Sequence, residues 1–161
     1  MEERELAHLR RSVELAAEAL DAGDEPFGSV LVDGAGAVRA EDRNRIADGD
    51  STRHPEFELA RWAAEHLTPG ERRDATVYTS GEHCPMCSAA HAWVGLGRIV
   101  YVASSAQLTQ WLAEWGRPQA PVRALPVQEV APSVKVEGPV DELVPVVKEL
   151  HRRLAERSSA A

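Results

Sequence analysis

Three side chains of this sequence, those of His54, Cys84 and Cys87, are of the types that bind zinc. His54 begins a His-x-Glu motif, and the two cysteines form a Cys-x-x-Cys motif further along the chain. One imidazole and two thiolates supply three of the four ligands of a tetrahedral zinc ion, and an open fourth position is typical of a catalytic zinc. The sequence therefore predicts one catalytic Zn²⁺ site per chain.

The glutamate of the first motif, Glu56, lies two positions after His54, where a carboxylate can move protons without binding the metal. Zinc lowers the pKa of bound water to about 7 and so makes hydroxide available at neutral pH. Glu56 is then expected to take a proton from the attacking water and to pass protons to a ring nitrogen and to leaving ammonia. Zinc deaminases combine these parts in this way.

The Cys-x-x-Cys motif has two other interpretations, a redox pair and half of a structural zinc site. The sequence contains only two cysteines, which excludes a disulfide framework and a second pair of thiolate ligands. The upstream His54 and Glu56 favour the catalytic interpretation over both.

Length and composition are typical of one globular domain, which we expect to span residues 1–161 with a frayed tail at about 157–161. The apolar and charged fractions are 43% and 27%, and the net charge is −8. An acidic protein with scattered arginines is a poor match for a large polyanion such as tRNA. The acidic N-terminus and the absence of a long apolar run predict a cytoplasmic protein without a signal peptide or a membrane span.

Hydrophobic periodicity, turn residues and prolines predict an alternation of strands and helices. The expected helices are 6–20, 55–67, 85–96, 107–115 and 141–156, and the expected strands are 27–32, 37–43, 75–79, 99–103 and 134–137. The strand 99–103 is uniformly apolar, which predicts a central position in the sheet. Residues 116–133 contain several prolines and are expected to be irregular. This order is typical of an α/β fold with helices covering a mixed sheet.

Four motifs in this order resemble the guanine deaminase branch of the cytidine-deaminase-like superfamily, over about residues 5–105. They are the strand that begins Pro26-Phe27-Gly28, Asn44 after the second strand, His54-x-Glu56, and a block with Glu82, Cys84-Pro85-Met86-Cys87, Ala89-Ala90 and Trp93. The resemblance implies a three-layer α/β/α sandwich with a central mixed sheet of about five strands. It also implies zinc-dependent release of ammonia and a homodimer.

On this resemblance we expect Asn44, Phe27 and Glu82 to bind substrate. Two alternatives remain open, because Asn is also common in turns and a single aromatic residue on a strand often belongs to the core.

Two positions depart from the family pattern. Pro55 stands where the family has Ala or Gly, and a proline has no backbone N–H to donate to the base. His83 stands where the family has a proline before the first cysteine. We expect it to be a hydrogen-bond donor near the zinc ligands or to lie at the pocket rim, rather than to bind the metal, and a surface position is the alternative. Both departures leave the zinc chemistry intact and put the family's usual substrate in question. The residues after 105 match no family motif.

The remaining aromatic and imidazole side chains allow structural interpretations. His91 lies on the expected third helix and is interpreted as structural, with a position facing the pocket as the alternative. Trp111 and Trp115 are one helical turn apart, which indicates a packing face or a lid over a flat substrate. His8, His66 and His151 are expected to be solvated helix positions.

The sequence thus predicts hydrolytic deamination of a free nucleobase or close analogue, guanine-like or cytosine- and triazine-like. The alternatives are a nucleoside deaminase, a tRNA adenosine deaminase and, outside enzymes, a non-catalytic zinc-binding module. A small-molecule substrate and a second copy of the chain are the expected partners, whereas nucleic acid and membrane are not.

Overall fold

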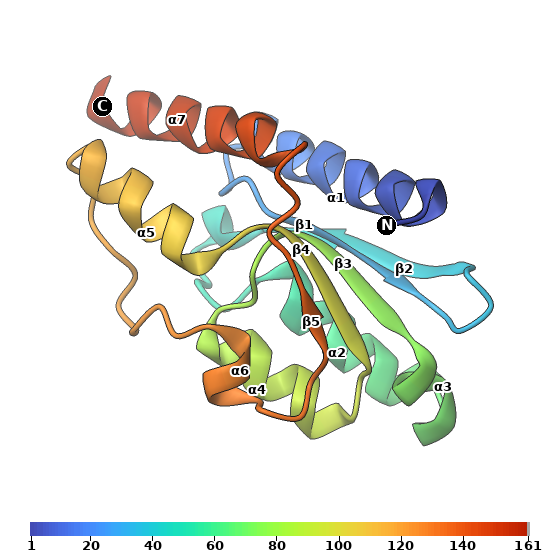
Figure 1. Cartoon of the computed structure of the whole chain (residues 1–161). Coiled ribbons are helices and arrows are strands. Elements are labelled where there is room, and N and C mark those ends of the chain that lie inside the picture. The colour runs from blue at the N-terminus through green and yellow to red at the C-terminus, as the bar shows by residue number, and fades with distance from the viewer. Residues whose placement is uncertain (161) are drawn as a thin grey trace.

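The computed structural model describes residues 1–160, which form one mixed sheet with helices on both faces (Figure 1). The helices are α1 (Glu3–Asp21), the 3-10 helix η1 (Ile46–Asp48), α2 (Pro55–His66), α3 (Pro69–Asp74), α4 (Pro85–Val94), α5 (Ser105–Glu114), α6 (Val127–Val130) and α7 (Val144–Ala160). The strands are β1 (Gly28–Val32), β2 (Val38–Arg43), β3 (Thr76–Gly81), β4 (Arg98–Ala103) and β5 (Val136–Glu137). The predicted α/β class is confirmed.

The five strands are ordered β2-β1-β3-β4-β5, so the expected five-stranded sheet is confirmed. β1 pairs antiparallel with both β2 and β3, whereas β4 runs parallel to β3 and β5. The strand β4 is flanked on both sides, as its uniformly apolar sequence predicts. Because β3 and β4 are parallel, the loops that follow them lie at the same edge of the sheet.

Helices α1 and α7 cover one face of the sheet and helices α2 and α4 cover the other (Figure 1). Alternate residues of each strand face opposite layers, so Val30 packs with α1 and α7 while Leu31 packs with α2. The helix α1 approaches β1 closely at Gly28, where a Cβ atom would lie 2.4 Å from the Leu15 Cβ. The helix α7 packs on the sheet of its own chain.

Some boundaries differ from those expected. Helix α3 follows Thr68, whose side chain accepts a hydrogen bond from Glu71 N and caps a helix that was not expected between residues 67 and 75. Residues 127–130 form α6 inside the segment expected to be irregular. Helix α7 extends through Ala160 into the expected frayed tail, and Ala161 lies outside the described residues. Among residues 1–160, no helix is long and apolar enough to cross a membrane.

Candidate metal centre and substrate site

The three metal-ligating side chains come from the starts of two neighbouring helices. His54 is the N-cap of α2 and Cys84 is the N-cap of α4, and neither side chain caps its own helix. A proline follows each of them in the first turn, where the missing N–H has no helical partner to lose. The positive ends of both helix dipoles therefore point to one spot and stabilise thiolate charge there.

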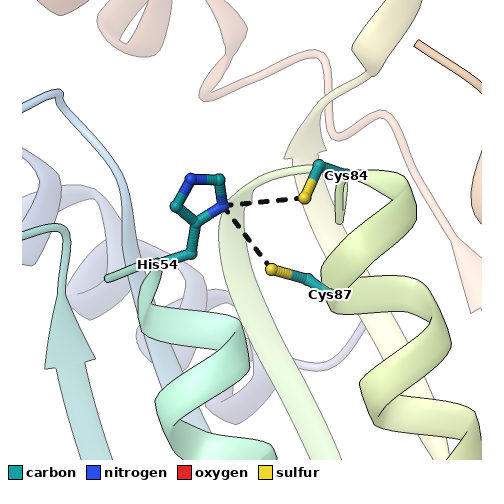
Figure 2. Close-up of side chains that lie close together, drawn as sticks. All are labelled: His54, Cys84 and Cys87. Atoms are coloured by element: carbon teal, nitrogen blue, oxygen red, sulfur yellow. Dashed lines mark hydrogen bonds between the residues drawn. The ribbon is translucent and has the colours of Figure 1, made fainter. Parts of the chain in front are cut away.

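The ligand atoms of this cluster have the spacing that zinc requires. The Nδ1 atom of His54 lies 3.6 Å from the Sγ of Cys84 and 3.6 Å from the Sγ of Cys87 (Figure 2). Tetrahedral bonds of ordinary Zn–N and Zn–S length would separate nitrogen and sulfur by about 3.6 Å. All three ligand atoms lie within 4.8 Å of one another, so these residues are placed to bind a metal ion.

The protonation of the two thiols also suits a metal. Hydrogen bonding from Cys87, assisted by His54, lowers the pKa of Cys84 to about 4. The hydrogen bond with Cys84, together with burial, raises the pKa of Cys87, so without a metal the two sulfurs share one proton. The hydrogen bond between His54 and Cys84 raises the pKa of His54. Because zinc displaces such protons from its ligands, the donor set fits a zinc ion.

Glu56, in the first turn of α2, is buried at 6% exposure and is not a member of the three-residue cluster. Its Oε1 atom accepts hydrogen bonds from Ser29 Oγ at 3.1 Å and from Thr79 Oγ1 at 3.0 Å. Those hydroxyls stand on β1 and β3, so the sheet fixes the orientation of the carboxylate. Burial raises the pKa of Glu56, while its hydrogen bonds and the charge of His54 oppose the rise. A buried carboxyl group with a raised pKa is suited to proton transfer.

Asn44 and Phe27 lie side by side next to β1 and β2. Asn44 N donates to Phe27 O at 3.0 Å, and Asn44 Oδ1 accepts from Ile46 N at 3.2 Å, which is the contact of an Asn turn residue. Asn44 is fully buried, and its Nδ2 has no hydrogen-bond partner among residues 1–160. Such a buried amide donor is costly unless a ligand uses it. The ring of Phe27 is half-buried and packs edge-on against His151 at 4.9 Å.

The carboxylate of Glu82 is engaged by the backbone. Its Oε2 accepts from Ser105 N at 2.9 Å and its Oε1 accepts from Val127 N at 3.0 Å. These amides stand at the starts of α5 and α6, so Glu82 ties both helices to the loop that carries Cys84. The predicted contact of Glu82 with substrate stays a prediction.

The two histidines near the cysteines are buried away from solvent. His83 is 1% exposed, which shows that the surface alternative is wrong, and neither of its ring nitrogens has a partner among residues 1–160. It packs edge-on against the His91 ring at 5.3 Å, and its expected role as a hydrogen-bond donor near the zinc ligands stays a prediction. His91 is structural as expected, because its ring Nε2 lies 2.8 Å from the carbonyl oxygen of Gly97.

The prediction of a solvated His151 is wrong. This residue of α7 is 6% exposed and lies between Phe27 and Trp111, whose ring centroid is 6.3 Å away. The steps from Val147 to His151 and on to Leu154 follow helical spacing, and this periodicity could have identified the buried position. Trp111 is also buried, in the same core as Trp115, so the packing-face interpretation of these two residues is confirmed.

Comparison with known proteins gives a family match over residues 2–103 of this chain, to the cytidine and deoxycytidylate deaminase zinc-binding region. A probable cytosine deaminase of Schizosaccharomyces pombe is 38% identical over 111 residues, which are 67% of this chain and 65% of that protein. The guanine deaminase of Bacillus subtilis is 39% identical over 97 residues, which are 59% of this chain and 62% of that protein. The alignments thus span a little under two thirds of the length of these relatives.

Two further similarities extend these findings. A tRNA-specific adenosine deaminase of Haemophilus influenzae is 34% identical over 97 residues, which are 60% of this chain and 56% of that protein. A solved structure of guanine deaminase from Nitrosomonas europaea superposes with a TM-score of 0.68 at 20% identity, covering 93% of this chain and 84% of that one. At that identity the superposition supports the fold, including the segment after residue 103 that the family match leaves out.

Proposed function

This chain belongs to the cytidine and deoxycytidylate deaminase family, and on that premise we propose that it removes the amino group of a free nucleobase or close analogue by hydrolysis. The observation that carries the proposal is the pairing of a three-ligand cluster with a buried carboxylate outside it. Three ligands leave one tetrahedral position open to water. The buried carboxylate supplies the proton transfers that release of ammonia requires.

Each residue of the site has one role in this proposal. His54, Cys84 and Cys87 hold a zinc ion, which supplies a water nucleophile activated at neutral pH. Glu56 moves protons between that water, the ring nitrogen and the departing ammonia. The hydrogen bonds from Ser29 and Thr79 keep the carboxylate oriented during these transfers.

Substrate contacts are assigned to three further residues. The free Nδ2 of Asn44 donates a hydrogen bond to an acceptor on the base, and the ring of Phe27 forms a wall of the pocket. Glu82 contacts the substrate as well, as the resemblance implies, while its two oxygens accept backbone hydrogen bonds from Ser105 and Val127. Pro55 offers no N–H to the base.

The experiment is an ammonia-release assay of the zinc-loaded protein on guanine, cytosine, adenine, their nucleosides and aza-analogues. We expect turnover of a free base, with guanine-like and cytosine- or triazine-like bases as the leading groups. Glu56→Ala should keep its zinc, and its deamination rate should fall by at least about two to three orders of magnitude. Glu58→Ala, a change of the same kind on α2 outside the site, should keep the rate. No turnover of any compound in the panel would contradict the proposal.

A tRNA adenosine deaminase is the second candidate, favoured by the similarity to the Haemophilus influenzae enzyme. The net charge of −8 opposes it, because tRNA binding depends on basic side chains that neutralise phosphates. Binding to tRNA that weakens steeply with salt, together with release of ammonia from an anticodon adenosine, would replace our proposal with this one.

A non-catalytic zinc-binding module is the candidate from outside enzymes. It requires four protein ligands and no water on the metal. X-ray absorption spectroscopy of the zinc-loaded protein separates the two. We expect two sulfur atoms, one imidazole and one light oxygen ligand, whereas a fourth protein ligand would favour the module.

We also propose that two copies of the chain associate. The observation in support is Trp93, which is 89% exposed in the last turn of α4. A large exposed aromatic side chain of this kind is typical of protein interfaces. Sedimentation of the wild type should give a dimer and that of Trp93→Glu a monomer. The cytoplasmic location stays a prediction.

A further inference from the structure

The short segment between α1 and β1 carries a carboxylate that its own fold does not use. Asp24, the first acidic residue there, accepts hydrogen bonds from Ala47 N at 2.8 Å and from Arg43 at 2.8 Å, and its own N–H donates to Ala19 O at 2.9 Å. The N–H of Phe27 donates to the carbonyl of Glu25 at 2.9 Å. These bonds fix the backbone from both sides, and none of them involves the side chain of Glu25.

The carboxylate of Glu25 is half-buried and has no hydrogen bond or ion pair among residues 1–160. Burial raises its pKa, and the one charge that acts on it in the opposite direction is that of His54, the metal ligand. Two residues on, the ring of Phe27 lies against Gly81, where an added Cβ would stand 3.0 Å from its Cε1 atom. Gly81 ends β3 three positions before Cys84, so the segment of Glu25 borders the metal cluster. Removing a carboxylate from water without a partner is costly, which leads us to look for the group that it binds.

A second unsatisfied group lies beside this segment. The Nδ2 of fully buried Asn44 has no partner within residues 1–160, and Asn44 is held to the segment by its hydrogen bond to Phe27 O. In the described part of the chain, Asn44 thus offers a free donor beside the segment that offers a free acceptor at Glu25. Pro55 removes a donor that a backbone N–H would have supplied, which shifts the balance further toward acceptors.

We propose that Glu25 is a specificity-determining residue that accepts a hydrogen bond from a ring N–H of the substrate and thereby selects free bases over nucleosides. A free purine or pyrimidine base carries an N–H at the nitrogen to which a nucleoside attaches its sugar. A base substituted there has no hydrogen to donate, so the half-buried carboxylate would remain unpaired. A site built to pair with an N–H rejects the analogue that lacks it far more strongly than an apolar pocket does.

This inference rests on the proposed function, and it is tested by binding so that the two can fail separately. The probes are guanine with 9-methylguanine and cytosine with 1-methylcytosine, in which a methyl group replaces the N–H in question. Dissociation constants are measured by calorimetry on zinc-loaded Glu56→Ala protein, in which turnover is suppressed. The same constants are then measured with Glu25→Gln and with Glu25→Ala added to that background.

Loss of a hydrogen bond to a charged group weakens binding about tenfold to a hundredfold. The Glu56→Ala protein should therefore prefer the free base over its methyl derivative by at least this factor, for the base that it binds best. Glu25→Ala should remove most of the preference by weakening the free base, and Glu25→Gln should remove part of it. Asp21→Ala, which changes an exposed acid at the end of α1, is the matched control and should leave the preference intact.

An unchanged preference in both Glu25 variants, with zinc content and thermal stability retained, would overturn the inference even if the wild type deaminates free bases. An equal affinity for free and methylated bases in the Glu56→Ala protein would overturn it as well. A lack of turnover in the ammonia assay would contradict the proposed function. The binding preference and its response to the Glu25 variants would still decide the role of Glu25 independently.

Discussion

The family-matched part of the chain, residues 2–103, and the segment after it, residues 105–160, contribute to the site in different ways. The first part supplies the metal ligands and Glu56, at the starts of helices and beside strands. The second part supplies packing, with His151 and Trp111 in the core against Phe27. Chemistry restricts which residue types can stand in the first part. Packing in the second can be achieved by many side chains, so its sequence says less about its role.

Glu82 and Arg98 are two of the side chains that join the parts. Glu82 accepts hydrogen bonds from the starts of α5 and α6. Arg98 on β4 pairs with Glu5 of α1 at 2.6 Å and with Glu137 of β5 at 2.6 Å. Variants in each part and at these two joints should therefore separate loss of chemistry from loss of stability.

The largest effect is expected from removal of a metal ligand. Cys84→Ser takes away the thiolate that ionises first, so the protein should lose its bound zinc and at least about three orders of magnitude in deamination rate. Metal analysis by mass spectrometry and the ammonia assay measure the two quantities. Glu56→Ala provides the contrast, because it should lose activity and keep one zinc per chain. Full activity of the Cys84→Ser protein without zinc would refute the assignment of the cluster.

In the C-terminal segment, the expected effect is on stability at acid pH. Burial lowers the pKa of His151 to about 4, against 6.5 for an unperturbed histidine. The unfolded chain therefore takes up this proton first, and folding stability falls as the pH drops from 6.5 toward 4. The loss amounts to about 3 kcal/mol for this group and is absent above pH 6.5.

Urea unfolding at a series of pH values between 7 and 4 measures this loss. His151→Phe keeps an aromatic ring next to Phe27 and removes the titrating group. The variant should show a shallower decline than the wild type, by up to about 1.4 kcal/mol per pH unit. Parallel declines in the two proteins would show that His151 is not neutral and buried.

Much of the fold follows from sequence patterns. Apolar runs bounded by turn residues identified the five strands, and helical spacing of apolar residues identified the longer helices. Helix α3 was not predicted, because its start signal, Thr68 with Glu71 three positions on, stands among residues that also break helices. Helix α6 was not predicted, because it is a single turn within a proline-rich stretch and its first N–H bonds to the distant side chain of Glu82.

The candidate site was predictable where a residue type has few uses. A His-x-Glu and a Cys-x-x-Cys in one chain have little other reason to occur together, and the structure brings the three ligands within reach of one ion. Glu82, His83 and Glu25 show the opposite case. Their partners, or their lack of partners, come from segments distant in sequence, and residue type alone does not tell a capping carboxylate from an unpaired one.

The next effect in size is at Glu82. Glu82→Gln replaces one accepting oxygen by an NH₂ group that faces a backbone N–H, so the starts of α5 and α6 lose a charge-assisted bond. We expect a loss of about 2 kcal/mol in the free energy of unfolding. The steady-state KM for the best substrate should also rise, because the proposed contact with substrate loses a charged acceptor. A KM that stays within about threefold would instead confine Glu82 to holding the starts of α5 and α6.

The smallest effect is expected at Arg98, the joint that is open to solvent. Its two carboxylate partners raise the pKa of Arg98, but the Glu137 side chain is 56% exposed, which screens that pair. Arg98→Met keeps the apolar part of the side chain and removes the charge. It should cost about 1 kcal/mol in urea unfolding at low salt, and less at high salt, because ionic strength weakens exposed pairs. If Arg98→Met lowers the free energy of unfolding as much as Glu82→Gln does, and the loss does not vary with salt, the ion pairs of Arg98 would be as important as the hydrogen bonds of Glu82. Charge would then contribute as much as helix capping to joining the two parts, beside the core that α1 and α7 share.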